Sequence, residues 1–248
     1  MNIILAFFGG LIYGSFLNVL LWRLPEGRGV NGRSRCRSCN HQLAWYDLVP
    51  VLSYLVLGGR CRYCHERIHH RYPIVEITTA LILGIFFIIR IPVLSIASGV
   101  DIFGLLILVS FFFFDLFYML LPDVLMFPAM GVYLAYDLVT KQDPMTYVLA
   151  ALLTASFFAI LYAASKGRGL GFGDVKLGLL LGLMLGYPTG FISVVLGIWI
   201  AAIVSIGLLL SGKYSRTDAI PLGSFLAFSA IIIIIFYHEI PRFVYHLF

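Results

Sequence analysis

Charged residues are scarce in this chain of 248 residues: Asp, Glu, Lys and Arg together make up only 12% of it. A soluble globular domain carries roughly twice that share of charge, so the composition excludes a protein that is mostly soluble. Apolar residues make up 61% of the chain. We expect an all-α, polytopic membrane protein with little mass outside the bilayer.

The first apolar run, 2–22, lacks both a basic segment ahead of it and a small-residue cleavage site. It therefore predicts a retained helix rather than a signal peptide. A helix needs about 20 mostly apolar residues to cross a bilayer. The separation of the sixth and seventh apolar runs depends on Tyr187-Pro188 alone. The sequence predicts about eight transmembrane helices, at 3–22, 73–90, 97–121, 125–140, 145–165, 174–187, 189–210 and 220–238.

Positive charge is unevenly distributed between the two sides of such a membrane protein. With the N-terminus outside, 14 of the 17 lysines and arginines fall in inner loops. Only Arg90, Lys141 and Arg242 remain outside. Because cytoplasmic loops carry the excess of Lys and Arg, we expect the loop 23–72 to be cytoplasmic. Its basic residues are either a topology signal that also contacts anionic lipid or an attraction for substrate.

Cysteine is absent from the chain except in the loop 23–72, which holds Cys36-x2-Cys39 and Cys61-x2-Cys64. Two such knuckles suit tetrahedral Zn²⁺, and four thiolates leave no ligand position for water. We therefore expect one structural Zn²⁺ in a small zinc-ribbon-like loop domain. Two disulfides or a redox pair are the alternatives, although a reducing cytosol disfavours disulfides. A nearby histidine in place of one cysteine is a further alternative, from among His41, His65, His69 and His70.

Acidic residues are also rare, and two of them lie in or beside apolar runs. Asp115 follows the run FGLLILVSFFFF, and Asp174 closes the tetrapeptide GFGD at the head of another. An ionised carboxylate in hydrocarbon costs at least a few kcal/mol, so such residues are functional candidates. The predicted topology brings both to the cytoplasmic face, which suggests a pair of carboxylates that shares one proton. That is the chemistry of an intramembrane aspartic protease.

Each aspartate also has a simpler interpretation. Asp174 is a good helix N-cap residue, although Gly171 and Gly173 beside it favour close approach of another chain. Asp115 has no local helix start to cap, and its alternative role is a buried polar residue satisfied by a Lys or Tyr. Asp123 lies about 12 Å from Asp115 along an ideal helix, so we interpret it as a turn or cap residue beside the site.

Besides the two cysteine knuckles, the chain carries in order the segments GSFLNVLLWRLP (14–25), YDLVPVLSYL (46–55), GGRCRYC (58–64), RYPIVE (71–76), DLFYMLLPD (115–123), GFGDVK (171–176) and PLGSFLAF (221–228). With these motifs the chain resembles the type IV prepilin peptidase family over nearly its whole length. The resemblance implies a GxGD-type aspartic protease with Asp115 and Asp174 as the catalytic dyad. We expect Gly171, Gly173, Asp123 and Lys176 to support the catalytic loop.

The same resemblance implies the substrates and a second activity. Family members cleave the short basic leader of type IV prepilins and related pseudopilins on the cytoplasmic side of the bacterial inner membrane. Those with the cysteine loop typically also methylate the new α-amino group, usually of phenylalanine, with S-adenosylmethionine. We therefore expect prepilins and lipid as partners, in type IV pilus assembly or type II secretion, and no nucleic acid.

The methyl-donor site is less defined. No GxG loop on a strand–helix unit is present, which excludes a soluble Rossmann-type methyltransferase. By resemblance the site involves the loop 23–76 and neighbouring helix ends. Glu76 is the best single candidate, with a helix-dipole contact as its alternative role.

The expected domains are a first transmembrane helix (1–22), a cytoplasmic zinc-binding loop associated with methyl transfer (23–72), and a transmembrane protease (73–248). An ion-coupled transporter predicts internal inverted repeats, and none is evident in the sequence. A non-catalytic assembly factor with a zinc loop is the third hypothesis.

Overall fold

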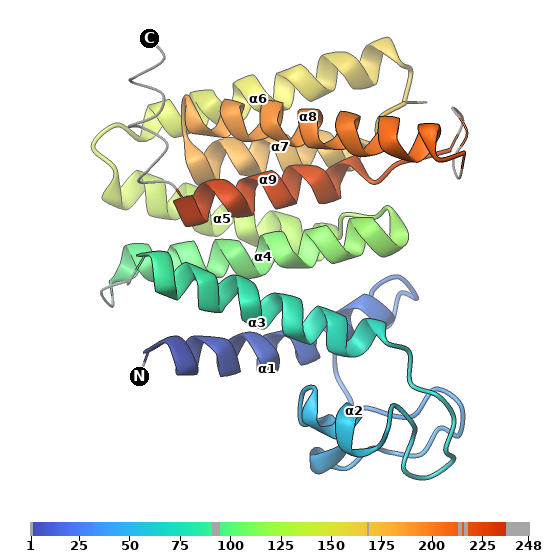
Figure 1. Ribbon diagram of the computed structural model, residues 1–248. Helices are drawn as coiled ribbons and strands as arrows, with labels where there is room; N and C mark the ends of the chain where they lie inside the picture. Colours follow the sequence, from blue (N-terminus) through green and yellow to red (C-terminus); the bar gives the residue numbers. More distant parts are fainter. Residues whose placement is uncertain (1, 91–94, 168, 213–214, 216–217, 237–248) are drawn as a thin grey trace. The chain divides into compact units, whose positions relative to one another are not determined.

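The computed structural model describes residues 2–90, 95–167, 169–212, 215 and 218–236, and it divides into two compact units, Met1–Val93 and Leu94–Phe248. Regular structure in these residues is helical, with two isolated β-bridges, which confirms the all-α prediction. The elements, labelled in Figure 1, are α1 (Asn2–Arg23), the 3-10 helix η1 (Trp45–Leu48), α2 (Leu52–Val56), α3 (Arg71–Arg90), α4 (Ile96–Tyr118), α5 (Asp123–Thr140), α6 (Pro144–Ala164), α7 (Phe172–Leu185), α8 (Thr189–Leu210) and α9 (Leu222–Phe236).

Each of the eight predicted spans coincides with a helix. In the described residues, six helices are long and apolar enough to cross a membrane: α1, α3, α4, α5, α6 and α8. The other two, α7 with 14 residues and α9 with 15, are shorter, each extending for only about 21 to 23 Å. The break at Tyr187-Pro188 is confirmed, because α7 ends at Leu185 and α8 begins at Thr189. The last predicted span, 220–238, reaches beyond the described residues.

In the first unit, α1 and α3 lie side by side and run antiparallel (Figure 1). Two glycines on one face of α1 allow the two backbones to touch. A Cβ atom at Gly10 would lie 2.5 Å from Cα of Ala80, and one at Gly14 would lie 2.6 Å from Cα of Glu76. Small residues that permit close backbone approach are a common basis of helix packing in membranes. The pairing sets Glu76 directly against α1.

The loop between α1 and α3 is organised from its beginning by Arg23. This buried guanidinium donates hydrogen bonds to the carbonyls of Val30, Asn31 and Gly32. The sequence analysis counted Arg23 only as a topology signal, but its side chain shapes the loop. Four other cations in that count lie outside the described residues: Arg168, Lys213, Arg216 and Arg242.

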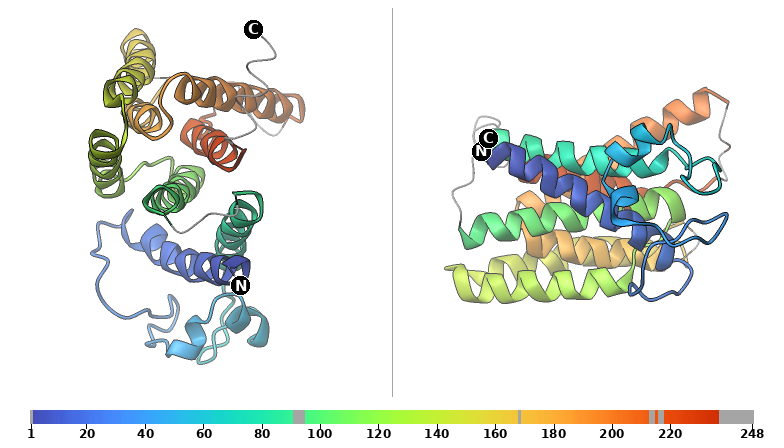
Figure 2. Two further views of the ribbon diagram at one scale, coloured as in Figure 1. Left: turned by 90° about the vertical axis from the view of Figure 1, so that its left-hand side faces the viewer. Right: turned by 90° about the horizontal axis from the view of Figure 1, so that it is seen from below.

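In the second unit, α6 packs along α7, and α9 contacts both α4 and α8 (Figure 2). Glycines again mark the closest approach, since a Cβ at Gly182 would lie 2.3 Å from Cα of Ala151. Polar groups at these contacts bond across the helices. Thr154 Oγ1 donates to the Gly178 carbonyl at 2.7 Å, and Ser229 Oγ donates to the Ser193 carbonyl at 2.8 Å. These two buried hydroxyl groups are thereby satisfied within the protein, as hydrocarbon requires.

The two neighbouring glycines Gly9 and Gly10 predict opposite responses to the same substitution. Gly10→Ala places a methyl group against the backbone of Ala80 and should destabilise α1–α3 packing by about 1 to 3 kcal/mol. Gly9→Ala meets nothing within 4 Å, and the better helix propensity of alanine should leave stability unchanged or slightly raised. Thermal unfolding of both variants in detergent checks this, and equal effects would contradict the packing.

Candidate functional site

The two cysteine pairs form two knuckles with the same local geometry. In the first, Cys36 N–H donates to the carbonyl of His41 at 2.9 Å, and Arg35 pairs with Gln42 in a β-bridge. In the second, the Cys61 N–H donates to the carbonyl of Glu66 at 2.8 Å. Equivalent turn residues, Asn40 and His65, have positive φ angles of 59° and 58°. The repeated turn directs both thiols of each knuckle to one side.

The four thiols converge on one point. Among the described residues, the Sγ atoms of Cys36, Cys39, Cys61 and Cys64 all lie within 4.8 Å of one another. The Cys36–Cys64 separation is 3.8 Å, which is about the edge of a tetrahedron with Zn–S bonds of about 2.3 Å. A disulfide needs about 2.05 Å, and all four cysteines are free. The cluster is therefore positioned to bind a metal ion, as the spacing predicted, and it contains no histidine.

The thiols of the cluster differ in acidity: burial and the neighbouring thiols raise the pKa values of Cys61 and Cys64, whereas the pKa of Cys36 is lowered. Burial opposes ionisation of Cys36, but N–H groups of Cys39 and Ser38 and the neighbouring thiols lower its pKa to about 7. A thiolate is the metal-binding form of cysteine. His41 stacks on the ring of Tyr63 with centroids 3.7 Å apart, and so packs beside the cluster rather than within it.

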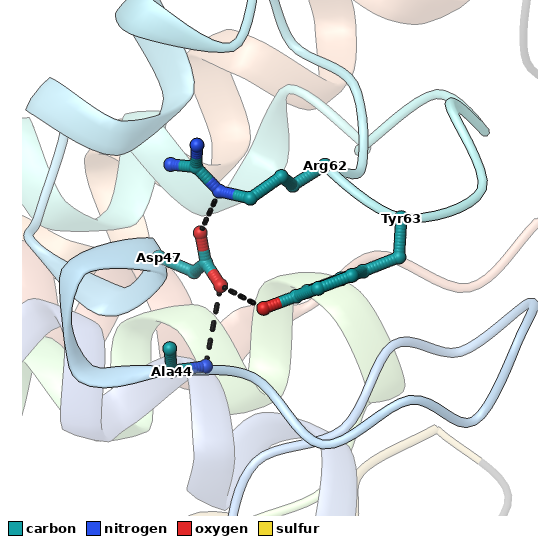
Figure 3. Close-up of polar contacts among 4 residues, drawn as sticks. All are labelled: Ala44, Asp47, Arg62 and Tyr63. Carbon is teal, nitrogen blue, oxygen red and sulfur yellow. Dashed lines mark hydrogen bonds and ion pairs between the residues drawn. The ribbon is translucent and has the colours of Figure 1, made fainter.

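Asp47 joins the segment after the first knuckle to the second knuckle (Figure 3). Its carboxylate accepts hydrogen bonds from Arg62 Nε at 2.7 Å, from Tyr63 Oη at 3.2 Å and from Ala44 N at 3.2 Å. Burial alone would raise the pKa of Asp47, but these donors and the charge of Arg62 together hold that pKa below its usual value. The ionised carboxylate therefore holds η1 against the second knuckle. The sequence analysis did not find this role, because no regular spacing in the sequence links Asp47 to Arg62 or Tyr63.

A cavity of about 720 Å³ lies between the loop and the helix pair α1–α3. Its volume falls within the range of small-molecule sites, about 300 to 1,000 Å³. Glu76 lines it and is 7% exposed. Glu76 Oε2 accepts from Val51 N at 2.7 Å, and Ser15 also hydrogen-bonds to this side chain. The predicted methyl-donor residue thus lies in a cavity formed by the predicted segment 23–76 and α1.

In the second unit, Asp115 is buried near the end of α4. Met119 ends this helix in the left-handed conformation, with its N–H bonded to the Asp115 carbonyl at 2.8 Å. Asp115 Oδ2 accepts from the backbone N–H of Ser224 at 2.6 Å, and the Ser224 hydroxyl lies 3.1 Å from the same oxygen. Asp115 therefore does have a capping role, on the first turn of α9 rather than on its own helix. Sequence analysis did not find this cap.

Asp174 lies in the first turn of α7 but is not its N-cap. The helix begins at Phe172 after Gly171, and Asp174 Oδ2 accepts from the Gly171 N–H at 3.2 Å. This is the returning half of a capping box, in which the third residue of the helix binds the N-cap backbone. The predicted helix start at 174 is therefore two residues late.

Leu121 connects the surroundings of the two aspartates. A Cβ at Gly173 would lie 3.3 Å from Leu121 Cδ1, and a Cβ at Gly223 would lie 3.3 Å from the same atom and 3.0 Å from Asp115 Cγ. Asp115 also acts electrostatically on Asp174. The structure thus brings the carboxylates from α4 and α7 into one neighbourhood with little side-chain bulk. A pair of carboxylates in such a place can activate a water molecule.

Asp123 and Lys176 form an ion pair, with Lys176 Nζ 2.5 Å from Asp123 Oδ1. Asp123 is the first residue of α5, and Lys176 lies two residues after Asp174. The ammonium group also lies 5.5 Å from the ring centroids of Phe127 and Phe172. The pair ties the start of α5 to the start of α7, and the predicted support of a catalytic loop by these two residues stays a prediction.

Comparison with known proteins shows the family of the chain. Residues 8–95 match the Bacterial Peptidase A24 N-terminal domain, and residues 102–206 match the Type IV leader peptidase family. The chain is 32% identical to the "Prepilin leader peptidase/N-methyltransferase" of Aeromonas salmonicida (strain A449) over 269 residues, covering 96% of this chain and 92% of the relative. The chain belongs to the type IV leader peptidase family.

Two further relatives of the same name extend the comparison. The Pseudomonas aeruginosa protein is 29% identical over 94% of this chain and 90% of its own length. The Vibrio cholerae protein is 34% identical over 71% of this chain and 74% of its own length. No solved structure matches the chain.

Two buried polar residues were missed by sequence analysis. Ser224 lies in the segment PLGSFLAF, which was recognised only as a motif, and its contact with Asp115 spans 109 positions. Asp137 in α5 is 1% exposed, and its Oδ2 has no hydrogen-bond partner among the described residues. Asp137 could have been found by considering every acidic residue in the predicted spans, and not only those in motifs.

The cysteine geometry predicts about one bound metal ion per purified chain. Cys39→Ser and Cys64→Ser should each lower metal retention, and the double variant should lose it, because a structural site needs its full ligand set. Elemental analysis after dialysis measures this. Ser38→Ala, which keeps all four thiols, is the matched control. Full metal content in the double variant would disprove the site.

Proposed function

We propose that this protein is a bifunctional prepilin-processing enzyme of the bacterial inner membrane. It removes the short basic leader of type IV prepilins or pseudopilins by aspartic proteolysis, and then methylates the new N-terminal residue. The observation that carries the proposal is the neighbourhood of Asp115 and Asp174, two acids from separate apolar helices with Gly173 and Gly223 beside them. The names of the relatives, over nearly the whole chain, support it.

Proteolysis follows from a shared proton. Repulsion between two close carboxylates keeps one of them protonated. The ionised member removes a proton from water, which attacks the scissile carbonyl carbon, and the neutral member donates its proton to the carbonyl oxygen. Ser224 holds Asp115 and the Gly171 N–H holds Asp174. Each carboxylate then enters the reaction with its orientation fixed.

We propose that the dyad faces the cytoplasm and that the N-terminus lies outside. The uneven distribution of Lys and Arg supports this orientation, with nine of these residues in the segment from Arg23 to Arg71. A cytoplasmic loop also fits four free thiols, because the cytosol is reducing. We propose Zn²⁺ as the ion of the cysteine cluster, since four thiolates in a tetrahedral site favour it. Its role is structural, with no ligand position left open.

We propose that the cavity of the first unit binds S-adenosylmethionine, which supplies the methyl group. Glu76 suits this cationic donor, because its hydrogen-bond partners among the described residues are the neutral groups Val51 N–H and Ser15. Asp47, which also lines the cavity, is already paired with Arg62. The loop 23–72 would then serve methyl transfer, and the dyad of the segment 73–248 would serve proteolysis.

Two other functions are less well supported. An ion-coupled transporter gives no role to a four-thiol cluster or to a large cavity beside it. A non-catalytic assembly factor gives no reason for two acids to share a glycine-lined neighbourhood in an apolar bundle, where charge is costly.

Loss of either dyad carboxylate should remove cleavage. Asp115→Asn and Asp174→Asn should each lower the cleavage rate by at least about a thousandfold, and the double variant should be no worse, as for residues that act as a unit. Mass spectrometry of a co-reconstituted prepilin measures the new N-terminus. Asp123→Asn, which loses only the ion pair with Lys176, should be milder.

The same variants test whether methyl transfer depends on the protease dyad. Both dyad variants should still methylate a pre-cleaved peptide that begins with phenylalanine. If Asp123→Asn were inactive while either dyad variant kept substantial proteolysis, the wrong aspartate would have been assigned.

Glu76→Gln tests the methyl-donor site. The amide keeps the size of the side chain and can still accept from Val51 N–H, but it removes the negative charge. Affinity for S-adenosylmethionine should fall by about tenfold or more, or about 1.4 kcal/mol, while prepilin cleavage and metal content remain unchanged. Equilibrium dialysis measures binding. The control is Glu66→Gln, which changes an exposed acid that also lines this cavity. An equal loss of S-adenosylmethionine affinity in that variant would mean that the net negative charge of the cavity matters, and not Glu76 in particular.

A further inference from the structure

Four large apolar side chains in the loop between α1 and α3 are more than half exposed. Trp45 at the start of η1 is 77% exposed, and on α2 Leu52, Leu55 and Val56 are 58%, 68% and 72% exposed. We call these four residues the α2 patch. A soluble loop seldom exposes such a cluster unless it contacts a partner or a membrane.

The α2 patch occupies the face of α2 that points away from the protein. Leu52, Leu55 and Val56 follow helical spacing, so they share one face. Ser53 and Tyr54 point the other way and line the cavity. The segment from Leu48 to Leu57 holds no charged residue. It is too short to cross a bilayer, which takes about 20 residues.

One hydrogen bond fixes the position of this segment along the axis of the helix pair α1–α3. The N–H of Val51, directly before α2, donates to Glu76 Oε2 at 2.7 Å. Glu76 lies five residues after Arg71, the first residue of α3, and so about 7 to 8 Å along the helix. Helical side chains lean toward the N-terminus, so Val51 lies level with the first turns of α3.

Those first turns lie at the membrane boundary. The 20 residues of α3, with an arginine at each end, extend for about 30 Å, which is the thickness of the hydrocarbon core. The neighbouring wall of the cavity extends from this boundary into the membrane. It includes Ile12 and Phe16 on the exposed apolar face of α1, which is itself a membrane span.

We propose that η1 and α2 lie in the lipid interface, with the α2 patch immersed at the boundary between headgroups and acyl chains. Interfacial helices place their apolar face about 5 to 10 Å into that boundary, which matches the level fixed by Val51. Tryptophan is enriched at this depth. The partner is the membrane that the spans of this chain already occupy, and the inference holds whether or not the chain is an enzyme.

Fluorescence quenching by brominated lipids tests the depth of Trp45. The chain has three tryptophans, so Trp22→Phe with Trp199→Phe leaves Trp45 as the only emitter. In nanodiscs, lipid brominated near the headgroup end of its acyl chains should quench Trp45 at least about twofold more than lipid brominated near the chain ends. The variant that keeps only Trp199, at the middle of the apolar helix α8, should show the reverse order.

A second measurement avoids the double substitution. Trp45→Phe in the otherwise unchanged protein should reduce the part of the emission that shallow bromine quenches, and Trp22, at the end of the membrane span α1, supplies the remainder. If Trp45 is not quenched in any brominated lipid, the α2 patch is not in the interface and the proposal fails. If a prepilin peptide abolishes the quenching, the α2 patch binds the substrate. If quenching falls as more protein is added to a fixed amount of lipid, the α2 patch contacts a second copy of this chain. Both outcomes overturn the proposal.

Discussion

Contact between helix backbones at glycine is the constraint on which both units depend. Lipid chains are as apolar as the helices, so association relies on close packing rather than on burial from water. In the first unit, Gly14 lies against the backbone of Glu76. In the second, Gly182 lies against the backbone of Ala151, and a Cβ at Gly223 would press within 3.0 Å of Asp115 Cγ. The absence of a side chain at these positions therefore both packs the helices and leaves room for the acids.

The second constraint is that polar groups need partners within the protein. Thr154 and Ser229 bond to carbonyls of neighbouring helices, and Asp115 bonds to the first turn of α9. The free N–H groups of a helix start are a natural place for a carboxylate. Asp174 meets the same need at the start of its own helix. Two helix starts thus hold the two acids, which explains how an apolar bundle keeps them without a basic partner among the described residues.

Features with a local signature could be predicted from the sequence. The apolar runs predicted the helices, and the CxxC spacing predicted the four-thiol cluster, because each knuckle is built from adjacent residues. Helix ends were less accurate: α4 ends at Tyr118 rather than at 121, and α7 begins at Phe172. Met119 and Gly171 decide those ends through backbone geometry that hydropathy does not report.

Contacts between distant segments could not be predicted. Ser224 meets Asp115 across 109 positions, and Asp47 meets Arg62 across 15, with no periodicity in either pair. The cavity was not foreseen for the same reason, since it forms only when the loop folds over α1 and α3. The pairing of Asp115 with Asp174 as a dyad stays a prediction, supported by their shared neighbourhood.

The level of the cavity has a consequence for how a substrate reaches it. Its wall runs from Cys36 in the loop to Ile12 and Phe16 on the membrane-exposed face of α1. If the dyad cuts its substrate at the cytoplasmic face, as proposed above, the new amino group is released near the membrane surface. If η1 and α2 rest in the interface, the cavity beneath them lies at the depth where that amino group is found. The loop would then bring the methyl donor to a substrate that need not leave the bilayer, and the exposed α2 patch would be the structural requirement for that position.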